Sequence, residues 1–462
     1  MIKAIVISFL VLVVSSSIFY AQDRGEPIMV IGDSLIGKVV EGESIREVIG
    51  NVTLTQGKVV VTCNKAIQFL SRNEAELIGN VVLKQDSLTI KTEQGFYFGN
   101  SKTTKSVSGI VLDDQKVILS ADSGEYFFNE DRAFFQSNVK LRDSSMTLTA
   151  DELTYFQTDD RAISVGNVTI SDDDNVITAD TLDHFRNTKH SIADGHVKIV
   201  SNDNNTIIFG DHLEDYSKKK YTLINENPVL LQIDTIYTAE DDSVESFRID
   251  SLIIKCEVME GIRDTSTIFK AIDSVKIIRG AFASVNDFTL YLRTDEKIII
   301  EKMNEEGEVP ILWYENSQLT GDSITVYLED NEIKSLDVNS NAFMLSQSKT
   351  YPERFDQTSS NNLQMYFEES NIKRAVFKGS VFSIYYMFED EGPTGLTKSS
   401  AKAAIIAFIE NEVSEVRLYG SPTSEYHPEN KVIGIERTFT LPKFVFYKNR
   451  PVKETLLSGL MK

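Results

Sequence analysis

Residues 139–168 read VKLRDSSMTLTADELTYFQTDDRAISVGNV, and the pattern of this stretch recurs along the chain every 29 residues. Four apolar ladders share this period: Val52, Val81, Ile110, Val139, Val168 and Val197; Leu54, Leu83, Leu112, Leu141 and Ile170; Val61, Ile90, Leu119, Leu148 and Ile177; and Phe69, Phe98, Phe127, Phe156 and Phe185. A repeat of this length indicates an array of similar units, each of which buries its apolar face against a neighbour.

The stretch is typical of two β-strands joined by short turns. Val139-Lys140-Leu141 alternates apolar and polar residues, a polar turn follows, and a second alternating segment runs from Leu148 to Phe156. At a rise of ~3.3 Å per residue, one period has no room for a crossover helix. We therefore predict an all-β fold of stacked two-strand coils in which each strand pairs with its equivalent in the next coil. The inward ladders of two sheets then face each other.

Glycine and asparagine recur just before the first apolar residue of a period. Gly50-Asn51, Gly79-Asn80 and Gly166-Asn167 are the cases in the regular part. Both residue types tolerate left-handed backbone angles, so we predict a bulge or bend there.

The array is not uniform along the chain. We divide it into five segments: 1–21, a signal peptide; 22–230, the regular array; 231–279, an irregular acidic insertion or altered coils; 280–440, a second array with longer turns; and 441–462, a basic tail. The signal peptide is predicted from Lys3, the apolar stretch Ile5–Val14 and the small Ala21. The alternative, a membrane anchor, needs an apolar run of ~20 residues.

Composition excludes several classes of function. The chain carries 47 Lys and Arg against 69 Asp and Glu, a net charge of −22, which disfavours nucleic acid as a partner. The five histidines show no metal-ligand spacing, and there is no phosphate-binding loop, so we predict no metal, no cofactor and no catalysis. Cys63 stands where later periods have alanine and is predicted to be a small core residue without a disulfide bond.

The recurring phrases resemble a known family. Ala-Asp-x-Leu-x-x-Phe at Ala150–Phe156 and Ala179–Phe185, with Gly166-Asn167-Val168 between them, are similar to the OstA/LptA family. The resemblance implies a β-jellyroll, or β-taco, with an apolar groove for lipid acyl chains. It also implies a bridge in the periplasm or associated with the outer membrane, which carries lipopolysaccharide. Such a bridge pairs edge to edge with homologous β-jellyroll domains and with the outer-membrane translocon.

The ladder residues are the candidates for the groove wall. They are Val52, Leu54, Val61, Phe69, Val81, Leu83, Ile90, Phe98, Ile110, Leu112, Leu119, Phe127, Val139, Leu141, Leu148, Phe156, Val168, Ile170, Ile177 and Phe185. The period alone does not distinguish an open groove from a closed core. Two other functions stay open: a structural or adhesive surface β-solenoid, and a β-helix enzyme that acts on polysaccharide.

Overall fold

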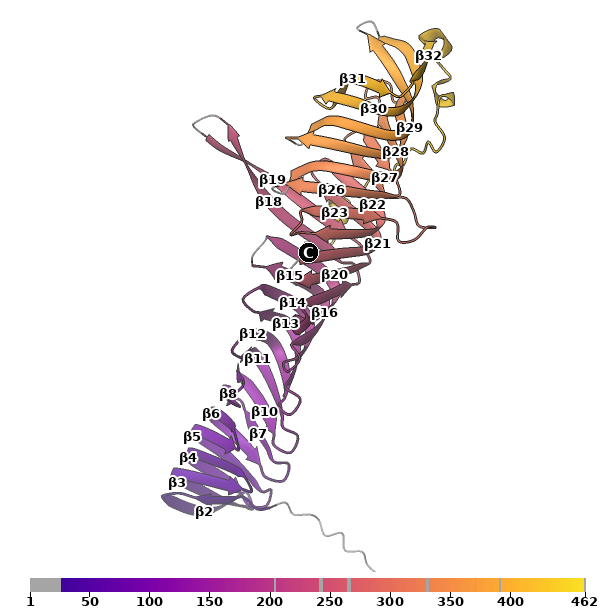
Figure 1. Ribbon diagram of the computed structural model, residues 1–462. Helices are drawn as coiled ribbons and strands as arrows, with labels where there is room; N and C mark the ends of the chain where they lie inside the picture. Colours follow the sequence, from indigo (N-terminus) through magenta and orange to yellow (C-terminus); the bar gives the residue numbers. More distant parts are fainter. Residues whose placement is uncertain are drawn as a thin grey trace, which may run out of the picture. The chain divides into compact units, whose positions relative to one another are not determined.

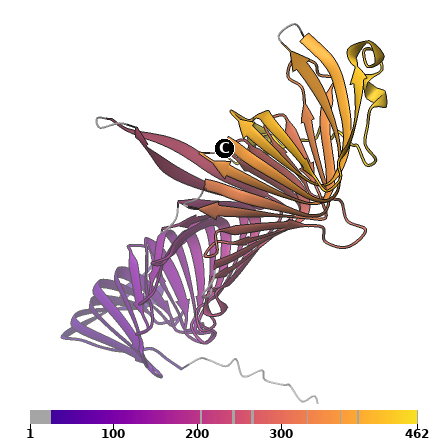
Figure 2. The same ribbon diagram turned by 45° about the horizontal axis from the view of Figure 1, so that its top comes forward.

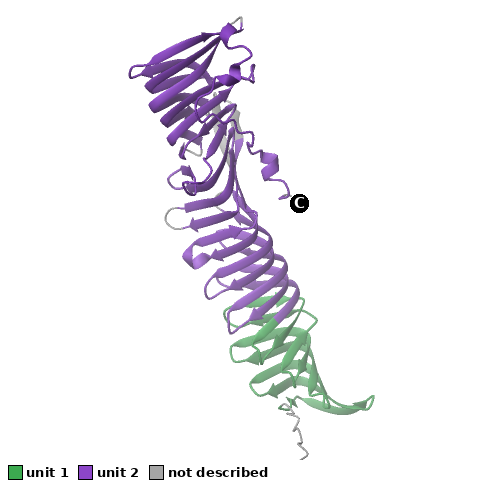
Figure 3. Ribbon diagram, turned by 90° about the vertical axis from the view of Figure 1, so that its right-hand side faces the viewer, with its two compact units in different colours: residues 1–133 green, residues 134–462 purple. Residues whose placement is uncertain are grey.

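The computed structural model describes residues 26–460 except 203–204, 241–243, 264–266, 330–331, 370 and 390–391, and side chains at 234–240 and 244–248 are not described. The predicted signal peptide, residues 1–21, lies outside the described residues. The chain forms two compact units, Met1–Ala133 and Phe134–Lys462 (Figure 3). Each is described by itself.

Unit 1 consists of short and long strands. They are β1 (Met29–Ile31), β2 (Ser34–Val40), β3 (Glu43–Gln56), β4 (Val59–Phe69), β5 (Glu74–Gln85), β6 (Leu88–Phe98), β7 (Thr103–Ser106), β8 (Ile110–Asp113), β9 (Ile118–Ala121) and β10 (Ser123–Phe127). The boundary between the units falls within β11 (Arg132–Arg142).

The described part of unit 2 contains the remaining strands and several short helices. The strands are β12 (Thr147–Phe156), β13 (Arg161–Ser171), β14 (Asn175–Phe185), β15 (His190–Ser201), β16 (Thr206–Tyr216), β17 (Tyr221–Asn225), β18 (Val229–Glu240), β19 (Val244–Lys255), β20 (Val258–Arg263), β21 (Thr267–Arg279), β22 (Phe282–Leu292), β23 (Lys297–Glu301), β24 (Ile311–Tyr314), β25 (Ser317–Thr320), β26 (Ser323–Glu329), β27 (Glu332–Gln347), β28 (Phe355–Glu368), β29 (Asn371–Glu389), β30 (Gly392–Ile409), β31 (Glu412–Tyr419) and β32 (Thr423–Pro428). The helices are η1 (Ser217–Lys219), η3 (Glu429–Lys431), η4 (Glu436–Thr438) and α1 (Lys453–Leu456).

The all-β prediction is confirmed, but the predicted pairing partner was wrong. Consecutive strands form antiparallel hairpins: β12 pairs with β13, β13 with β14, and β14 with β15. Strands one period apart are therefore next-nearest neighbours. A tight polar turn favours this arrangement, because it returns the chain directly alongside the strand that it has just left.

The long strands of the regular array are bent in the middle, where the sequence predicts a bulge. In β13 the register shifts between Val165 and Val168, around Gly166 and Asn167, whose φ angles are +79° and +44°. The Asn167 amide donates to the Asp151 carboxylate on β12 over 2.8 Å. Equivalent contacts join Asn51 to Asp33 in unit 1 and Asn341 to Asp322 in unit 2.

The bend divides the sheet of each unit into two facing walls. In β13, Arg161–Val165 belongs to the first wall and Val168–Ser171 to the second wall, and neighbouring strands divide in register with it. An unbent strand of eleven residues would hold its ends ~36 Å apart. In unit 1, however, Tyr97 at the far end of the first wall donates to Gln56 at the far end of the second wall over 2.6 Å. The bent strands must therefore fold back far enough for the two free rims to touch.

The segment predicted to be irregular, residues 231–279, contains regular strands in a different arrangement. β18 and β19 pair along their whole length from Val229↔Lys255 to Glu240↔Val244, but only their ends near Val229 and Lys255 pair with other strands. The hairpin therefore projects from unit 2, as the labelled strands of Figure 1 and the turned view of Figure 2 show.

The C-terminal strap, defined as residues 429–460, runs back across unit 2 from β30 to β18 (Figure 3). It packs on the outer face of the second wall: Phe439 against Ile384, Tyr447 against Trp313, and Leu456 against Val229 and Ile253. The basic tail predicted at 441–462 forms most of this strap. No helix in the described part of the chain is long and apolar enough to cross a membrane.

Candidate functional site

The apolar ladders of unit 1 are completely enclosed between its two walls. Each of the following groove candidates is at most 2 % exposed: Val52, Leu54, Val61, Val81, Leu83, Ile90, Ile110, Leu112 and Leu119. Cys63 is buried beside them as a free thiol, as predicted. This interior is a packed core and leaves no open channel in the conformation described.

The phenylalanine ladder lies on the outer face of the walls, so these residues do not line the interior. Phe69, Phe98, Phe127, Phe156 and Phe185 are all half-buried, one residue after the buried Gln68, Tyr97, Tyr126, Tyr155 and His184. Their rings instead support arginines: the guanidinium carbon of Arg72 lies 4.3 Å from the Phe69 ring centroid, and that of Arg132 lies 3.9 Å from the Phe127 ring centroid. Cation–π contacts of this kind stabilise the outer surface.

In unit 2 the enclosure of the interior ends midway along the array. Leu141 and Leu148 are fully buried, and Val139 and Val168 nearly so, but Ile170 is 9 % exposed and Ile177 is half-buried. On β16 the inward Ile208 is also half-buried. The interior is therefore accessible around β13 to β16, and it is enclosed again further along, where Ile324 and Val338 are fully buried.

Two adjoining cavities occupy this region. An apolar cavity of about 150 Å³ is lined by residues of both walls, among them Ile199, Ile208, Ile224, Leu230, Met259 and Phe269. A polar basin of about 410 Å³ adjoins it and shares Asn175, Ile199 and Arg263 with it. An enclosed apolar space of 150 Å³ can hold a molecule about the size of benzene, so this cavity fits a segment of an acyl chain.

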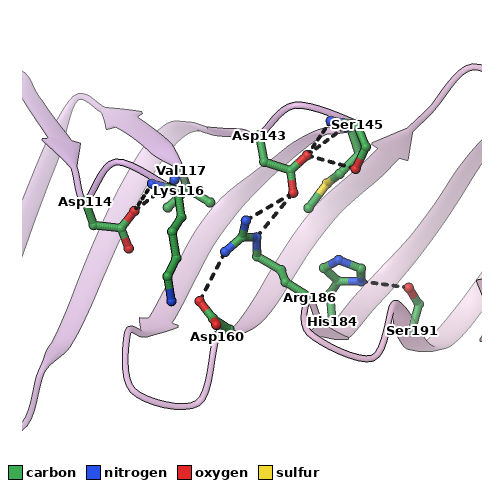
Figure 4. A network of polar contacts seen from close by, with 10 residues as sticks. Asp114, Lys116, Val117, Asp143, Ser145, Asp160, His184, Arg186 and Ser191 are labelled. Atoms are coloured by element: carbon green, nitrogen blue, oxygen red, sulfur yellow. Dashed lines mark hydrogen bonds and ion pairs between the residues drawn. The ribbon is translucent and has the colours of Figure 1, made fainter. Parts of the chain in front are cut away.

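Charged side chains surround the basin. At one end Arg186 contacts two carboxylates: its Nε and Nη2 lie 3.3 Å from Asp143 Oδ2, and its Nη1 lies 3.2 Å from Asp160 Oδ1 (Figure 4). Burial raises the pKa of Asp143, but N–H groups of Ser145 and Met146 and the Arg186 charge outweigh burial and hold this pKa below its usual value. At the other end Arg263 pairs with Asp215 over 2.7 Å.

His184 lies in the basin wall as a neutral ring. Its Nδ1 is 2.9 Å from the Ser191 hydroxyl, and burial lowers its pKa to about 4. A histidine in the unfolded chain titrates near 6.5. Between these pH values the unfolded chain binds a proton that the folded chain does not, so stability falls as the pH falls from about 6.5 to 4.

Replacement of His184 by leucine, combined with Ser191→Ala, is expected to remove this contribution to the pH dependence. One period earlier, Ala162 already stands at the position of Ser191. The free energy of unfolding of the double variant should fall by up to about 3 kcal/mol less than that of the parent between pH 6.5 and 4. Urea unfolding at several pH values measures this difference, and parallel pH profiles would contradict the assignment.

The arrangement as a whole combines an apolar interior with a charged mouth. No group of three or more His, Cys, Asp and Glu side chains among the described residues could hold a metal ion. Apolar pockets with a few polar groups at one end are typical of binding sites for amphiphilic molecules.

Comparison with known proteins agrees with the repeat pattern. A family model described as OstA-like protein matches residues 29–180 and 121–208. Residues 29–208 are therefore similar to the OstA-like family. A solved structure titled LptH, the LptA-homologous periplasmic component of the lipopolysaccharide transport device of Pseudomonas aeruginosa, is 15 % identical, with 30 % of this chain and 83 % of that chain covered and a TM-score of 0.17. No curated protein matches the chain.

The OstA-like segment includes every groove candidate and ends at residue 208, in the strand that lines the apolar cavity. Other residues of the cavity wall, such as Met259 and Phe269, come from strands beyond the matched segment. The sequence signal for the cavity was therefore incomplete: the ladder indicated an apolar interior, and nothing in the period indicated where it opens.

Proposed function

We propose that the chain is a periplasmic lipid-binding bridge that carries lipopolysaccharide toward the outer membrane, with acyl chains held between its two walls. The observation that carries the proposal is the apolar cavity around Ile208, reached through the polar basin, in a chain whose residues 29–208 are OstA-like. An acyl chain of about a dozen carbons gains ~10 kcal/mol on leaving water, but little on leaving a membrane. Such a groove can hold lipid and release it, while another component drives the transport.

The proposal extends to the partners of the chain. Every residue of β2 is exposed, including Leu35 and Val39, and β2 pairs with β3 on one side only among the described residues. A bare edge of this kind favours the addition of another strand. We infer that a homologous β-jellyroll domain of the transport machinery, or the translocon, pairs with this edge.

A purely structural role is the second candidate, favoured by the closed core of unit 1. The two functions differ in what they predict for Ile208. A photo-crosslinking residue at Ile208 should form an adduct with purified lipopolysaccharide, and one at the outward-facing Thr169 should not. Ile208→Glu should weaken binding more than tenfold, because an acyl chain would then contact a carboxylate.

The matched control is Thr169→Glu, which adds the same charge to the outer face of the second wall. If both crosslinking positions reacted equally, or if both glutamate variants bound lipid like the parent, the cavity would not be the binding site. The structural role would then be the better account of the fold.

A further inference from the structure

The ion pair between Arg186 and Asp143 joins the two free rims of the folded sheet. Asp143 lies in the turn between β11 and β12, beyond the second-wall end of these strands. Arg186 lies in the turn between β14 and β15, beyond the first-wall end. The contact therefore spans the open side of the fold, opposite the line of bends.

Each partner of the ion pair is also held in place by hydrogen bonds of its own. The Asp143 carboxylate accepts hydrogen bonds from the N–H groups of Ser145 and Met146 over 2.7 and 2.9 Å. The Arg186 N–H donates to the Asp160 carbonyl over 3.0 Å, and its guanidinium also contacts the Asp160 carboxylate. The side chains of Arg186, Asp143 and Asp160 are only 13 %, 11 % and 7 % exposed, so salt screens this cluster less than a surface pair.

The Arg186–Asp143 pair also lies at the point where the interior changes from enclosed to accessible. Leu141 and Leu148, in the strands that flank Asp143, are fully buried, whereas Asp143 and Arg186 themselves contribute to the basin wall. One period further along, Asp172 takes the position of Asp143, and Ser217 takes the position of Arg186, because its N–H donates to the Lys189 carbonyl as that of Arg186 donates to the Asp160 carbonyl. A serine carries no charge that could form an ion pair with Asp172, and both residues line the basin.

We propose that the Arg186–Asp143 pair is a latch that sets where the lipid groove begins. With the latch closed, lipid enters only at the basin, where the rim opposite Asp172 carries a serine in place of the arginine. With the latch open, the rims separate over a further period toward the N-terminal side of unit 2, and the space over Leu148 joins the groove. The role of the latch in lipid access rests on the proposed function, whereas its effect on the rims does not.

The test measures access to the interior without any lipid. Leu148→Cys, in a chain with Cys63→Ala and Cys256→Ala, places the single thiol beneath the latch, and its rate of alkylation by a maleimide reports how often the rims separate. Arg186→Gln should raise this rate at least tenfold, about 1.4 kcal/mol in the opening equilibrium. Arg186→Lys keeps one charge but cannot contact both carboxylates, so it should give an intermediate rate.

Arg161→Gln is the matched control. Arg161 pairs with Asp183 over 2.6 Å, but both residues lie in the first wall, on adjacent strands, and they join no rims. Equal alkylation rates in the parent and Arg186→Gln would overturn the latch, and so would an equal rise in Arg161→Gln, which would indicate general loosening. A rise confined to the Arg186 variants, in a protein that never crosslinks lipid at Ile208, would retain the latch and overturn the proposed function instead.

Discussion

A chain truncated after Pro428, without the C-terminal strap, is expected to lose the fold of unit 2. The outer face of the second wall is apolar under the strap, with Val229, Ile253 and Trp313 at its centre. Removal of Leu456 and Tyr447 would expose these side chains as one continuous stripe. Exposed stripes of this kind cause aggregation in a soluble protein.

The truncation also removes the partners of a buried charge. Arg354 is 2 % exposed, and its guanidinium contacts Glu429 over 2.5 and 3.1 Å and Glu436 over 3.6 Å. Only Glu353, 3.9 Å from Arg354 Nε, would remain as an ionic partner. Breaking a buried ion pair by removing one partner costs about 3–5 kcal/mol, a large fraction of the total stability of a typical domain. We therefore expect insoluble protein, or a urea midpoint far below that of the full chain.

The strap is held through its backbone as well as its side chains, which suggests a rescue experiment. The Gln318 amide donates to the Val445 carbonyl and accepts from the Tyr447 N–H, and Gln357 contacts Phe439 and Leu441 in the same way. A peptide of residues 429–462 supplied in trans should restore solubility by mass action. The same peptide with Phe439→Asp and Leu456→Asp should not. A soluble truncated chain with an unchanged urea midpoint would contradict this account.

The strap also shows which region of the fold a local pattern cannot predict. Its sequence indicates only a basic, aromatic tail, whereas its position depends on contacts such as Gln318 to Val445, between residues 127 positions apart. The 29-residue ladders, in contrast, depend on contacts between strands that are close together in the sequence. For this reason the buried residues from Val52 to Val168 and the positions of the bends were predictable, and the strap was not.

The error in the phenylalanine ladder has a specific physical cause. In β4 the inward residues are Val61 and Cys63 before the bend, and Ala66 and Gln68 after it. At the bend the alternation of buried and exposed residues in β4 slips by one residue between Cys63 and Ala66, and such a slip moves every later side chain to the opposite face. Alternation counted without the bulge places Phe69 inside, whereas the structure buries Gln68 and turns Phe69 outward.

The latch is a third feature that the sequence pattern could not predict. Asp143 and Arg186 are 43 positions apart in two polar turns, and in the sequence each is one charged residue among many. Their proximity follows only when the strands are known to be hairpins bent in the middle, because then turns at opposite ends of the strands meet. The equivalent positions one period later, Asp172 and Ser217, become informative by the same step.

Gly166→Val is expected to have the second large effect, because the bend makes two walls from one sheet. Gly166 has a φ of +79°, and a Cβ there would lie 2.5 Å from Asp151 Oδ2. The left-handed backbone costs a residue with a side chain about 1–2 kcal/mol, and the overlap adds about 1–3 kcal/mol. The free energy of unfolding should therefore drop by about 2–5 kcal/mol, measured by urea denaturation.

Further variants separate the cost of the left-handed backbone from the cost of the steric overlap and test the role of the bend. Gly261→Ala is the control, since its Cβ would meet Thr222 at 3.9 Å, an ordinary contact. Gly166→Ala should be strongly destabilising. Adding Asp151→Ala should recover the stability lost to the steric overlap but not the stability lost to the left-handed φ.

If the bend holds the rims together, Gly166→Val should also speed alkylation of the thiol introduced by Leu148→Cys, as Arg186→Gln does, although Gly166 lies at the opposite side of the fold from the latch. Loss of stability without faster alkylation would show that the rims are held by the latch and the apolar interior alone.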